Sequence, residues 1–279
     1  MPELPEVETT LRGIAPTLVD STISEIIVRN ASLRWPVPTQ ALSKLVGQSI
    51  FKAERRAKYI LLHTPIGVIL LHLGMSGSLS IVDLDDHAAQ PKKHDHVDLQ
   101  VVDSKGQRKA VRLNDPRRFG CCLLLKEPIW EHKLLTSLGP EPLQEFFSGE
   151  YLFKRSRGRS VALKNFIMDG KIVVGVGNIY ASEALFMARI RPTTAAKRLS
   201  RKRYQKLVDT IKQVLGDAIK AGGTTLNDFT QADGKPGYFK QELKVYGRAG
   251  EACVECGTTI KSQVIGQRNT FFCPNCQTF

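Results

Sequence analysis

Short runs of alternating apolar and polar residues dominate the first half of the chain. The run from Thr22 to Val28 is rich in β-branched residues, and turn residues such as those from Gly74 to Gly77 separate the runs that follow. Strands are therefore predicted over residues 22–28, 58–62, 68–73, 78–82, 97–102, 109–113 and 121–125. Strands joined by such short turns pair antiparallel, which predicts a sandwich or a flattened barrel.

The second half changes to a helical spacing of apolar residues. One helix is predicted over residues 179–187, and a longer one is capped by Ser200 and ended by glycines 222–223. Residues 128–149, rich in Pro and Gly, are predicted to connect the two halves, and a polar loop is predicted over residues 224–238. The apolar face of the longer helix consists of Tyr204, Leu207, Val208, Ile211, Val214, Leu215, Ala218 and Ile219.

Positive charge is concentrated in one block of the sequence. The formal net charge is +13, and between Tyr151 and Arg203 there are 13 Lys and Arg residues but only two acids. Such a block is the electrostatic signature of polyanion binding. A membrane surface is the weaker alternative because no amphipathic lipid-facing helix accompanies the block. We therefore predict a nucleic-acid partner and no membrane.

The sequence predicts a soluble cytoplasmic protein. The first twenty residues contain three glutamates and lack an apolar core of signal-peptide length. No later run approaches the length of a membrane span. Thiols stay reduced in the cytoplasm, so the six cysteines are expected to be metal ligands or core residues and not disulfides.

Four cysteines form the strongest local motif. Cys253 and Cys256 are followed, after sixteen residues, by Cys273 and Cys276. Two such pairs present four thiolates in a tetrahedron, which is the donor set of a closed structural zinc site. Because four protein ligands leave no open position, the zinc ion is expected to fold a small hairpin and not to activate water. The other two cysteines lie in an apolar strand and are predicted to be packing residues.

The first eight residues have two interpretations. If Met1 is removed, Pro2 carries a secondary amine whose pKa is expected nearer that of an α-amino group, about 7.7–8.0, than that of a lysine, about 10.4. Near neutral pH such an amine is partly unprotonated, so it can attack an electron-poor carbon and form an iminium. Glu3, directly beside it, could move the protons that this chemistry requires. The simpler interpretation is an ordinary helix start, with Pro5 at the first helical position and Glu6 in the first turn. The apolar stripe of that helix consists of Val7, Leu11, Ile14 and Leu18. A rigid helix would also hold the terminus still, so both interpretations stay open.

Two turns carry residues that are suited to distorting DNA. The turn over residues 114–120 displays two arginines, among them Arg117, together with Phe119. Such a loop can push a wedge into the base stack; the alternative is a surface turn with a core phenylalanine. Met75, in the glycine-flanked turn over residues 72–77, raises the same question.

Two further motifs have weaker interpretations. His94 and His96 lie on one face of a possible strand, which would permit a metal site, but lysines 92–93 beside them favour an anion. Residues 175–177 lack the third glycine and the preceding strand of a dinucleotide fingerprint, so that interpretation is rejected. A helix that begins at Asn178 would nevertheless bind a phosphate well.

Taken together, these residues resemble the bacterial formamidopyrimidine-DNA glycosylase family, also called 8-oxoguanine DNA glycosylases. The resemblance runs over the whole chain. Its motifs are MPELPEVET at the start, RRAKY (55–59), HLGMSGSL (72–79), KHDHVD (93–98), DPRRFG (115–120), GVGNIYASE (175–183), GGTTL and DGKPGYF between 222 and 239, and the terminal cysteine pairs. The related endonuclease VIII branch shares the architecture, but this N-terminus and the wedge motif are similar to the purine-lesion branch.

The resemblance implies an α+β protein of two domains with DNA lying across the cleft between them. Residues 1–130 would form an N-terminal antiparallel β-sandwich with flanking helices, which is the catalytic domain, and residues 131–150 a linker. Residues 151–239 would form a helical helix-two-turns-helix DNA-binding domain, and residues 240–279 a zinc-finger β-hairpin with one structural zinc ion. The resemblance further implies a monomer with no obligate protein partner.

The resemblance also implies the catalytic chemistry. Pro2 attacks C1′ of the damaged nucleoside and expels the base, which leaves an imine to the opened sugar, and Glu3 is the acid for ring opening. Lys58 matches the residue assigned to proton transfer in β-elimination, and Arg268 matches the one assigned to δ-elimination. The product would be a one-nucleotide gap with phosphate on both ends.

The implied DNA contacts follow from the need to flip the damaged base out of the duplex, at a cost of a few kcal/mol. Met75, Arg117 and Phe119 would form the wedge that fills the gap and contacts the orphaned cytosine. Lys164 and the loop from Thr224 are candidates for holding the lesion base. Arg159 stands where a lysine is expected. The whole implied DNA-binding set is Met75, His94, Arg117, Phe119, Arg159, Lys164, Asn178 and Tyr238.

The sequence therefore predicts a base excision repair enzyme of the bacterial cytosol, associated with the nucleoid. It would be a bifunctional DNA glycosylase and AP lyase that excises oxidised purines from double-stranded DNA, with 8-oxoguanine and formamidopyrimidines as the lesions. One alternative is a non-catalytic zinc protein that binds damaged or bent DNA without cutting it. A third hypothesis keeps the chemistry but prefers oxidised pyrimidines.

Overall fold

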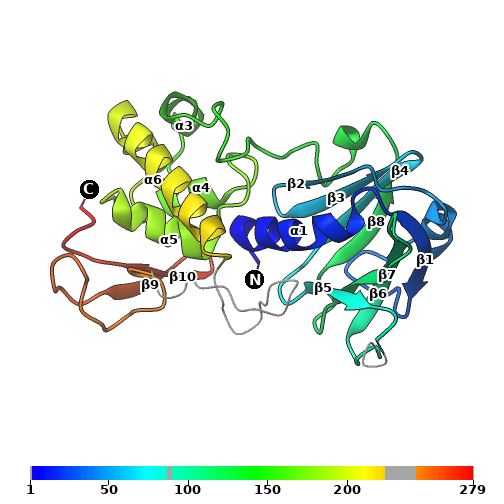
Figure 1. Cartoon of the computed structure of the whole chain (residues 1–279). Helices are drawn as coiled ribbons and strands as arrows, with labels where there is room; N and C mark the ends of the chain where they lie inside the picture. Colours follow the sequence, from blue (N-terminus) through cyan, green and yellow to red (C-terminus); the bar gives the residue numbers. More distant parts are fainter. Residues whose placement is uncertain (1, 87–89, 224–242, 279) are drawn as a thin grey trace. The chain divides into compact units, whose positions relative to one another are not determined.

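The computed structural model describes residues 2–86, 90–223 and 243–278, and the chain divides into two compact units (Figure 1). Unit 1 comprises Met1–Thr136 and Ala221–Tyr238, and unit 2 comprises Ser137–Lys220 and Phe239–Phe279. In the described part of the chain, no helix is both long enough and apolar enough to cross a membrane.

Unit 1 is a sandwich of two four-stranded antiparallel sheets with one long helix, α1 (Leu4–Leu18). The first sheet has the strand order β1 (Thr22–Val28), β6 (Asp95–Val102), β7 (Arg108–Asn114), β5 (Ser78–Asp83). The second has the order β2 (Lys52–Arg56), β3 (Tyr59–Thr64), β4 (Gly67–His72), β8 (Cys121–Leu125). The short helical segments α2 (Thr39–Leu42), η1 (Ser43–Leu45) and η2 (Ile129–Glu131) complete this unit. The predicted antiparallel sandwich is confirmed.

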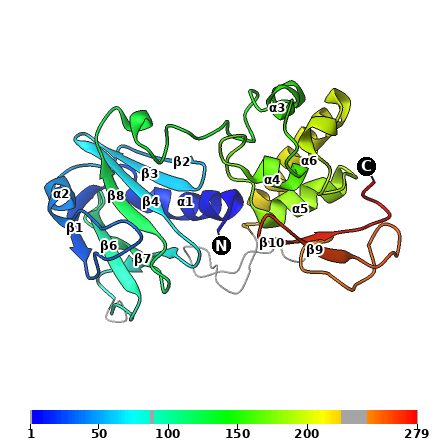
Figure 2. The same ribbon diagram turned by 180° about the vertical axis from the view of Figure 1, so that it is seen from behind.

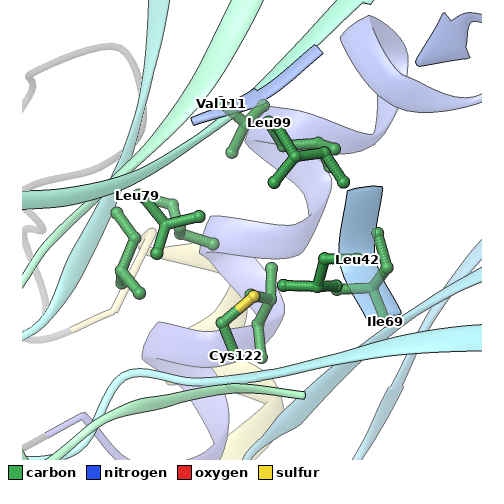
Figure 3. A pocket seen from close by; sticks show the side chains of 10 residues that line it. Leu42, Ile69, Leu79, Leu99, Val111 and Cys122 are labelled. Atoms are coloured by element: carbon green, nitrogen blue, oxygen red, sulfur yellow. The ribbon is translucent and has the colours of Figure 1, made fainter. Parts of the chain in front are cut away.

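The core of unit 1 lies between the two sheets and along α1. The predicted stripe of α1, from Val7 to Leu18, is buried with apolar residues of both sheets. A small cavity of about 20 Å³ remains in this core, and its lining, drawn in Figure 3, includes Leu99 and Cys122. Burial raises the pKa of Cys122 to about 12 and that of Cys121 to about 12 as well, so both thiols stay protonated. The cavity is therefore a packing gap among apolar side chains, and the two cysteines are packing residues as predicted.

Unit 2 is helical and ends in a β-hairpin. Its elements are α3 (Gly149–Ser156), α4 (Leu163–Met168), α5 (Asn178–Met187), η3 (Ala196–Arg198), α6 (Arg201–Lys220), β9 (Lys261–Ile265) and β10 (Arg268–Phe272). Helices α3 and α5 pack against α6, and α5 also contacts β10, as the view from behind shows (Figure 2). The predicted cap is present, because Ser200 Oγ accepts a hydrogen bond from the backbone nitrogen of Arg203 at 3.4 Å.

Candidate functional site

The N-terminus forms the start of helix α1. Pro2 is buried, and Glu3, 3 % exposed, is the N-cap residue. The Glu3 backbone nitrogen donates to Glu6 Oε2 at 2.8 Å, and the two glutamates form a reciprocal capping box. The capping box gives hydrogen-bond partners to backbone N–H groups that have none within the helix, so it holds the first residues of the helix in one geometry. The predicted helix is confirmed, but it begins at Leu4, one residue before the predicted start at Pro5. The nucleophile interpretation of Pro2 stays a prediction.

Gly223 packs against this helix start. Its φ is +83°, in the region that favours glycine, and a Cβ added there would lie 3.3 Å from Glu6 Oε1. Unit 1 therefore brings a glycine that is distant in the sequence onto the residues beside Pro2. The loop predicted over residues 224–238, which includes Tyr238, lies outside the described residues.

Lys58 lies at a turn beside a partly buried histidine that sequence reasoning did not single out. It is the second residue of the two-residue turn between β2 and β3, and the following Tyr59 pairs with His72 across the sheet, with ring centroids 5.1 Å apart. Burial and the nearby Lys58 ammonium lower the pKa of His72 to about 4. His72 Nδ1 accepts from the Gly74 backbone nitrogen at 3.0 Å, so the imidazole is neutral and its proton lies on Nε2.

Asp115 joins the two turns that were predicted to form a wedge. This residue is 0 % exposed; its Oδ2 accepts from the Gly120 backbone nitrogen at 2.7 Å and its Oδ1 from Ser76 Oγ at 3.1 Å. A Cβ added at Gly74 would lie 2.5 Å from the Gly120 nitrogen, so only glycine permits this contact. The turn that carries Met75 and the turn over residues 114–120 are therefore fixed to each other.

The residues of the second turn are exposed and stacked. The Arg117 guanidinium carbon lies 5.0 Å from the ring centroid of Phe119. Phe119 is 42 % exposed, so the alternative with a core phenylalanine is wrong. A hollow of about 480 Å³ beside the ring is lined by Ser32, Arg34, Arg117, Arg118 and Phe119, which makes it electropositive. This surface suits an anionic ligand with planar groups, as nucleic acid is.

His94 and His96 support this turn from the neighbouring strand. A bulge in β6 at this point breaks the pairing register, and His96 Nε2 lies 2.8 Å from the Asp115 carbonyl oxygen. The Asp115 backbone nitrogen donates to the His94 carbonyl oxygen at 3.0 Å. Among the described residues, neither histidine belongs to a group of three potential metal ligands, so the structure gives the metal interpretation no support.

Unit 2 places Lys164 and Asn178 in one buried cluster. Lys164, on α4, is 0 % exposed, and its ammonium donates to Asn178 Oδ1 and Thr270 Oγ1. Asn178, the first residue of α5, donates through Nδ2 to the Asn269 carbonyl oxygen at 3.0 Å. The predicted contact of Lys164 with DNA would require an exposed ammonium, so the structure favours a supporting role in which this residue orients Asn178 and the hairpin.

Arg268 begins β10 directly after a tight turn. The two turn residues, Gly266 and Gln267, have φ values of +56° and +62°, as a two-residue type I′ hairpin requires. Arg268 is exposed at the start of the strand. Arg159 is also exposed; it follows α3, and its Nε donates to the Arg155 carbonyl oxygen at 3.1 Å. Both arginines are therefore available to an anion.

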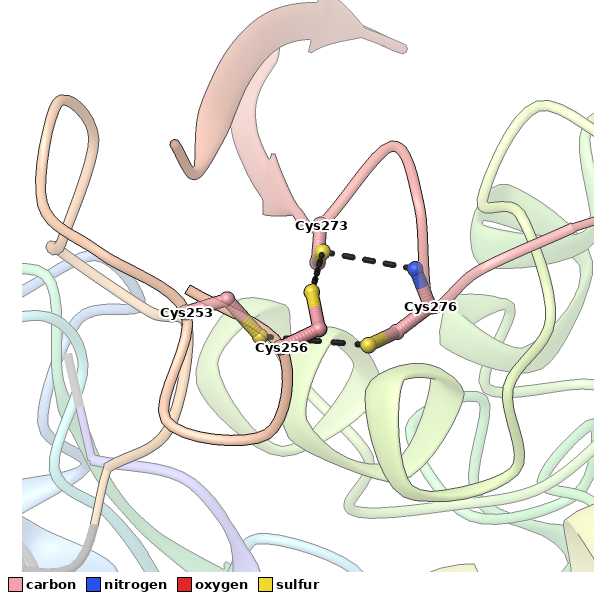
Figure 4. Close-up of side chains that lie close together, drawn as sticks. All are labelled: Cys253, Cys256, Cys273 and Cys276. Carbon is pink, nitrogen blue, oxygen red and sulfur yellow. Dashed lines mark hydrogen bonds between the residues drawn. The ribbon is translucent and has the colours of Figure 1, made fainter. Parts of the chain in front are cut away.

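The four predicted zinc ligands gather at the base of the hairpin (Figure 4). Their sulfur atoms all lie within 4.8 Å of one another, with Cys253 and Cys276 3.9 Å apart and Cys256 and Cys273 3.5 Å apart. A zinc tetrahedron with Zn–S bonds of about 2.3 Å has sulfur–sulfur edges of about 3.8 Å. The prediction of one structural zinc ion is confirmed.

Three family models match the chain in order. They are the formamidopyrimidine-DNA glycosylase N-terminal domain over residues 1–122, the formamidopyrimidine-DNA glycosylase H2TH domain over residues 138–230, and the zinc finger found in FPG and IleRS over residues 250–278. The H2TH match identifies the predicted helix-two-turns-helix domain, and the zinc finger match agrees with the four clustered cysteines.

Relatives named as formamidopyrimidine-DNA glycosylases match over nearly the full length. The chain is 57 % identical to the formamidopyrimidine-DNA glycosylase of Magnetococcus marinus over 280 residues, which cover 99 % of both chains. It is 56 % identical to that of Actinobacillus pleuropneumoniae over 277 residues, which cover 99 % of this chain and 98 % of the relative.

Solved structures with DNA share the fold. A variant of the Lactococcus lactis FPG protein in complex with DNA that contains Fapy-dG matches with a TM-score of 0.89 and 30 % identity over the whole of both chains. The Lactococcus lactis Fpg complex with abasic-site DNA matches with a TM-score of 0.89 and 31 % identity, again over the whole of both chains. A MutM complex with DNA that contains carbocyclic 8-oxo-G gives a TM-score of 0.87 and 31 % identity, with the same coverage.

Proposed function

The chain belongs to the formamidopyrimidine-DNA glycosylase family, and from this membership we propose that it excises oxidised purines from double-stranded DNA and then cuts the strand at the abasic site. The observation that carries this proposal is that the fold matches, over the whole chain, family members whose structures contain damaged DNA. The enzyme is thus a base excision repair glycosylase and AP lyase, with 8-oxoguanine and formamidopyrimidines as its substrates.

Pro2 and Glu3 are the proposed catalytic pair. The Pro2 nitrogen attacks C1′ of the damaged nucleoside, loses its proton and displaces the base; the C1′–O4′ bond then breaks, which leaves an iminium between proline and the opened sugar. Glu3 supplies the proton for ring opening. The capping box supports this assignment because it holds Glu3 at the start of a long helix, and Pro2 is bonded directly to Glu3. A group held within about 0.5 Å of its productive position reacts most efficiently.

Lys58 and Arg268 are the proposed elimination residues. Lys58 takes part in proton transfer during β-elimination, and Arg268 assists δ-elimination, so that the strand ends in phosphate on both sides of a one-nucleotide gap. Their positions at two tight turns support these roles, since each side chain starts from a fixed backbone. His72 joins Lys58 as a neutral hydrogen-bond donor through Nε2.

The DNA contacts divide into a wedge and a set that holds phosphates. Met75, Arg117 and Phe119 form the proposed wedge, which fills the space of the flipped nucleotide; the locked turns and the exposed aromatic ring support it. His94, Arg159, Asn178 and Tyr238 are the proposed phosphate-binding residues, with Lys164 as the support of Asn178.

The proposed domain boundaries remain residues 1–130 for the catalytic sandwich, 131–150 for the linker, 151–239 for the DNA-binding domain and 240–279 for the zinc hairpin. The border between the two compact units at Thr136 falls inside the proposed linker and supports that part of the division. Residues 221–238, which the compact units place with unit 1, fall in the proposed DNA-binding domain. Because the substrate is chromosomal DNA, we place the enzyme in the bacterial cytosol, at the nucleoid, and propose that it acts there as a monomer.

Trapping with borohydride tests the catalytic proposal. The protein is incubated with an 8-oxoguanine duplex and sodium borohydride, and the covalent adduct is located by peptide mass measurement. The wild-type protein should give an adduct at Pro2, protein whose N-terminal amine has been blocked by acetylation should lose it, and the matched control Pro5→Ala should keep it. Intact-mass measurement shows in the same sample whether Met1 has been removed.

Two other outcomes would lead to other conclusions. Tight binding with no adduct and no strand cleavage, from protein that lacks Met1, would support the non-catalytic DNA-binding alternative. A faster turnover of oxidised pyrimidines than of 8-oxoguanine would support the third hypothesis, for which the Lactococcus lactis complex with oxidised-pyrimidine DNA gives a structural precedent in the family.

A further inference from the structure

The turn that carries Lys58 has a strained backbone. In the hairpin between β2 and β3, Arg56 pairs with Tyr59, which leaves Ala57 and Lys58 as the two turn residues. Ala57 has a φ of +56° and is 4 % exposed. A β-carbon in this left-handed region costs on the order of 1–3 kcal/mol, and such a conformation persists only where the surroundings hold it. Something in unit 1 therefore has to hold this turn.

Arg55 makes the contact that can hold it. Its Nη1 donates to the Ala57 carbonyl oxygen at 3.0 Å. That carbonyl belongs to the peptide bond between Ala57 and Lys58, so the guanidinium fixes the plane of the peptide from which the Lys58 side chain starts. Because a guanidinium is rigid and planar, the direction of its second contact sets the direction of this one.

The second contact of Arg55 reaches helix α1. Arg55 Nε donates to Glu8 Oε2 at 2.7 Å, and the two side chains are only 11 % and 18 % exposed. Burial acts to raise the pKa of Glu8, but the two arginines bound to it lower that pKa below its ordinary value, so the carboxylate is charged at neutral pH. Glu8 lies in the helix whose N-cap is Glu3. One guanidinium thus links the helix that begins beside Pro2 to the peptide that precedes Lys58.

We propose that Arg55, anchored on Glu8, is a positioning residue for Lys58. Arg55 holds the strained turn at Ala57, and this fixes the place of the Lys58 ammonium relative to helix α1. This inference rests on the proposed role of Lys58 in β-elimination. It assigns Arg55 a part in the elimination step without any contact with DNA.

The strain at Ala57 supplies a test that a purely structural role of Arg55 would not pass. Glycine adopts a positive φ at no steric cost, so Ala57→Gly removes the need for the guanidinium to hold the turn. If Arg55 acts through the turn, Ala57→Gly should restore the rate that Arg55→Gln has lost. If Arg55 only ties α1 to β2, the glycine should restore nothing.

The experiment measures single-turnover strand cleavage on a duplex with a preformed abasic site, at saturating enzyme. Arg55→Gln should slow cleavage by about 10- to 100-fold, the scale of a misplacement of about 1 Å, with little change in DNA affinity. The matched control is Arg12→Gln: Arg12 binds the other oxygen of Glu8 at 2.9 Å from the surface, its side chain 64 % exposed. This control should cleave at the wild-type rate. The double variant Arg55→Gln/Ala57→Gly should approach the rate of Ala57→Gly alone.

Two results would overturn the inference: equal rates for Arg55→Gln and Arg12→Gln, or a double variant as slow as Arg55→Gln. Arg55→Lys is a milder variant for the case that Arg55→Gln fails to fold. It keeps the positive charge but cannot donate in two fixed directions, so it should cleave at an intermediate rate. The wild type and Lys58→Gln, run alongside, separate the two proposals. If the wild type does not cleave, the proposed function fails; if Lys58→Gln is slow while Arg55→Gln is normal, only the positioning role fails.

Discussion

At the scale of the residue, the surroundings of His72 set its protonation. Its pKa in the folded protein is about 4, below the ordinary value of 6.5, so between these values the unfolded chain binds more protons than the folded one. Acidification from pH 6.5 to pH 4 therefore favours unfolding, and above pH 6.5 the residue contributes no pH dependence.

We predict that His72→Gln flattens the acid side of the stability profile. A glutamine cannot titrate, so the loss in the free energy of unfolding between pH 6.5 and pH 4 should shrink, by up to about 3 kcal/mol. Urea unfolding of the wild type and the variant, each at several values of pH in this window, measures the difference. An unchanged slope in the variant would mean that His72 is not the group responsible.

Residue identities were predictable where one short motif carries the chemistry, and not where partners are remote in the sequence. The zinc cysteines follow from a local pattern alone, as does the helix start to within one residue, whereas the pattern around Phe119 left its exposure open. The burial of Lys164 does not, because its partners Asn178 and Thr270 lie 14 and 106 residues away. The environment of His72 could not be predicted for the same reason, since it depends on the strand register that pairs His72 with Tyr59.

At the scale of the element, a single glutamate attaches helix α5 to the segment that leads into the zinc hairpin. Glu183 is 3 % exposed, and its carboxylate accepts from the backbone nitrogens of Lys244, Val245 and Tyr246 at 2.9, 3.0 and 2.8 Å. Burial raises the pKa of this carboxyl, and the three backbone donors counter that effect. One side chain thus satisfies three backbone groups and fixes where the hairpin segment begins.

We predict that Glu183→Gln destabilises this attachment. The glutamine amide nitrogen would oppose the Lys244 donor, which leaves a backbone group unsatisfied at a cost of about 1–3 kcal/mol. Hydrogen exchange at residues 244–246 should accelerate while the strands of unit 1 stay protected. Glu251→Gln is the control, because Glu251 is a surface acid, paired with Arg248. Equal exchange in the two variants would contradict the role given to Glu183.

Metal removal gives a second prediction for the hairpin. Sites of four cysteines fold together with their zinc ion, so a chelator should expose the amides of β9 and β10 to exchange and leave the β-sandwich intact. DNA affinity should fall with it, and added Zn²⁺ should restore both. Cys273→Ser should show the same loss without rescue by metal. Full DNA affinity in metal-free protein would contradict a structural zinc.

The elements that the sequence did not predict have physical reasons to be inconspicuous. Strand β2, Lys-Ala-Glu-Arg-Arg, shows no apolar alternation because it is the edge strand of its sheet, where charged side chains discourage pairing with other chains. Helices α3 and α4, of eight and six residues, are too short for a clear period. The strand predicted from residue 58 begins at Tyr59, since residues 57 and 58 form the turn that Arg55 holds.

At the scale of the whole molecule, the excess of positive charge predicts how DNA affinity depends on salt. Each phosphate that a Lys or Arg neutralises releases condensed counterions, so the logarithm of the association constant falls against the logarithm of the salt concentration with a slope of about −0.9 per contact. The net charge of +13 does not determine how many phosphate contacts form. The change in slope on substituting a single Lys or Arg shows whether that residue makes one of them.

Arg159 and Arg117 should respond differently in such a titration. Both are exposed, but Arg159 lies in the basic block of unit 2, whereas Arg117 stacks on Phe119 at the proposed wedge. Arg159→Gln should weaken binding to damaged and undamaged duplexes alike and reduce the magnitude of the slope by about 1, as loss of a phosphate contact requires. Arg117→Gln should instead slow excision of 8-oxoguanine more than it weakens binding to a duplex with a preformed abasic site, because there the base has already gone. Fluorescence anisotropy over a salt series and single-turnover excision measure the two effects separately. If Arg117→Gln reduced 8-oxoguanine excision and abasic-site binding by the same factor, Arg117 would not be part of a wedge and would be one more phosphate contact.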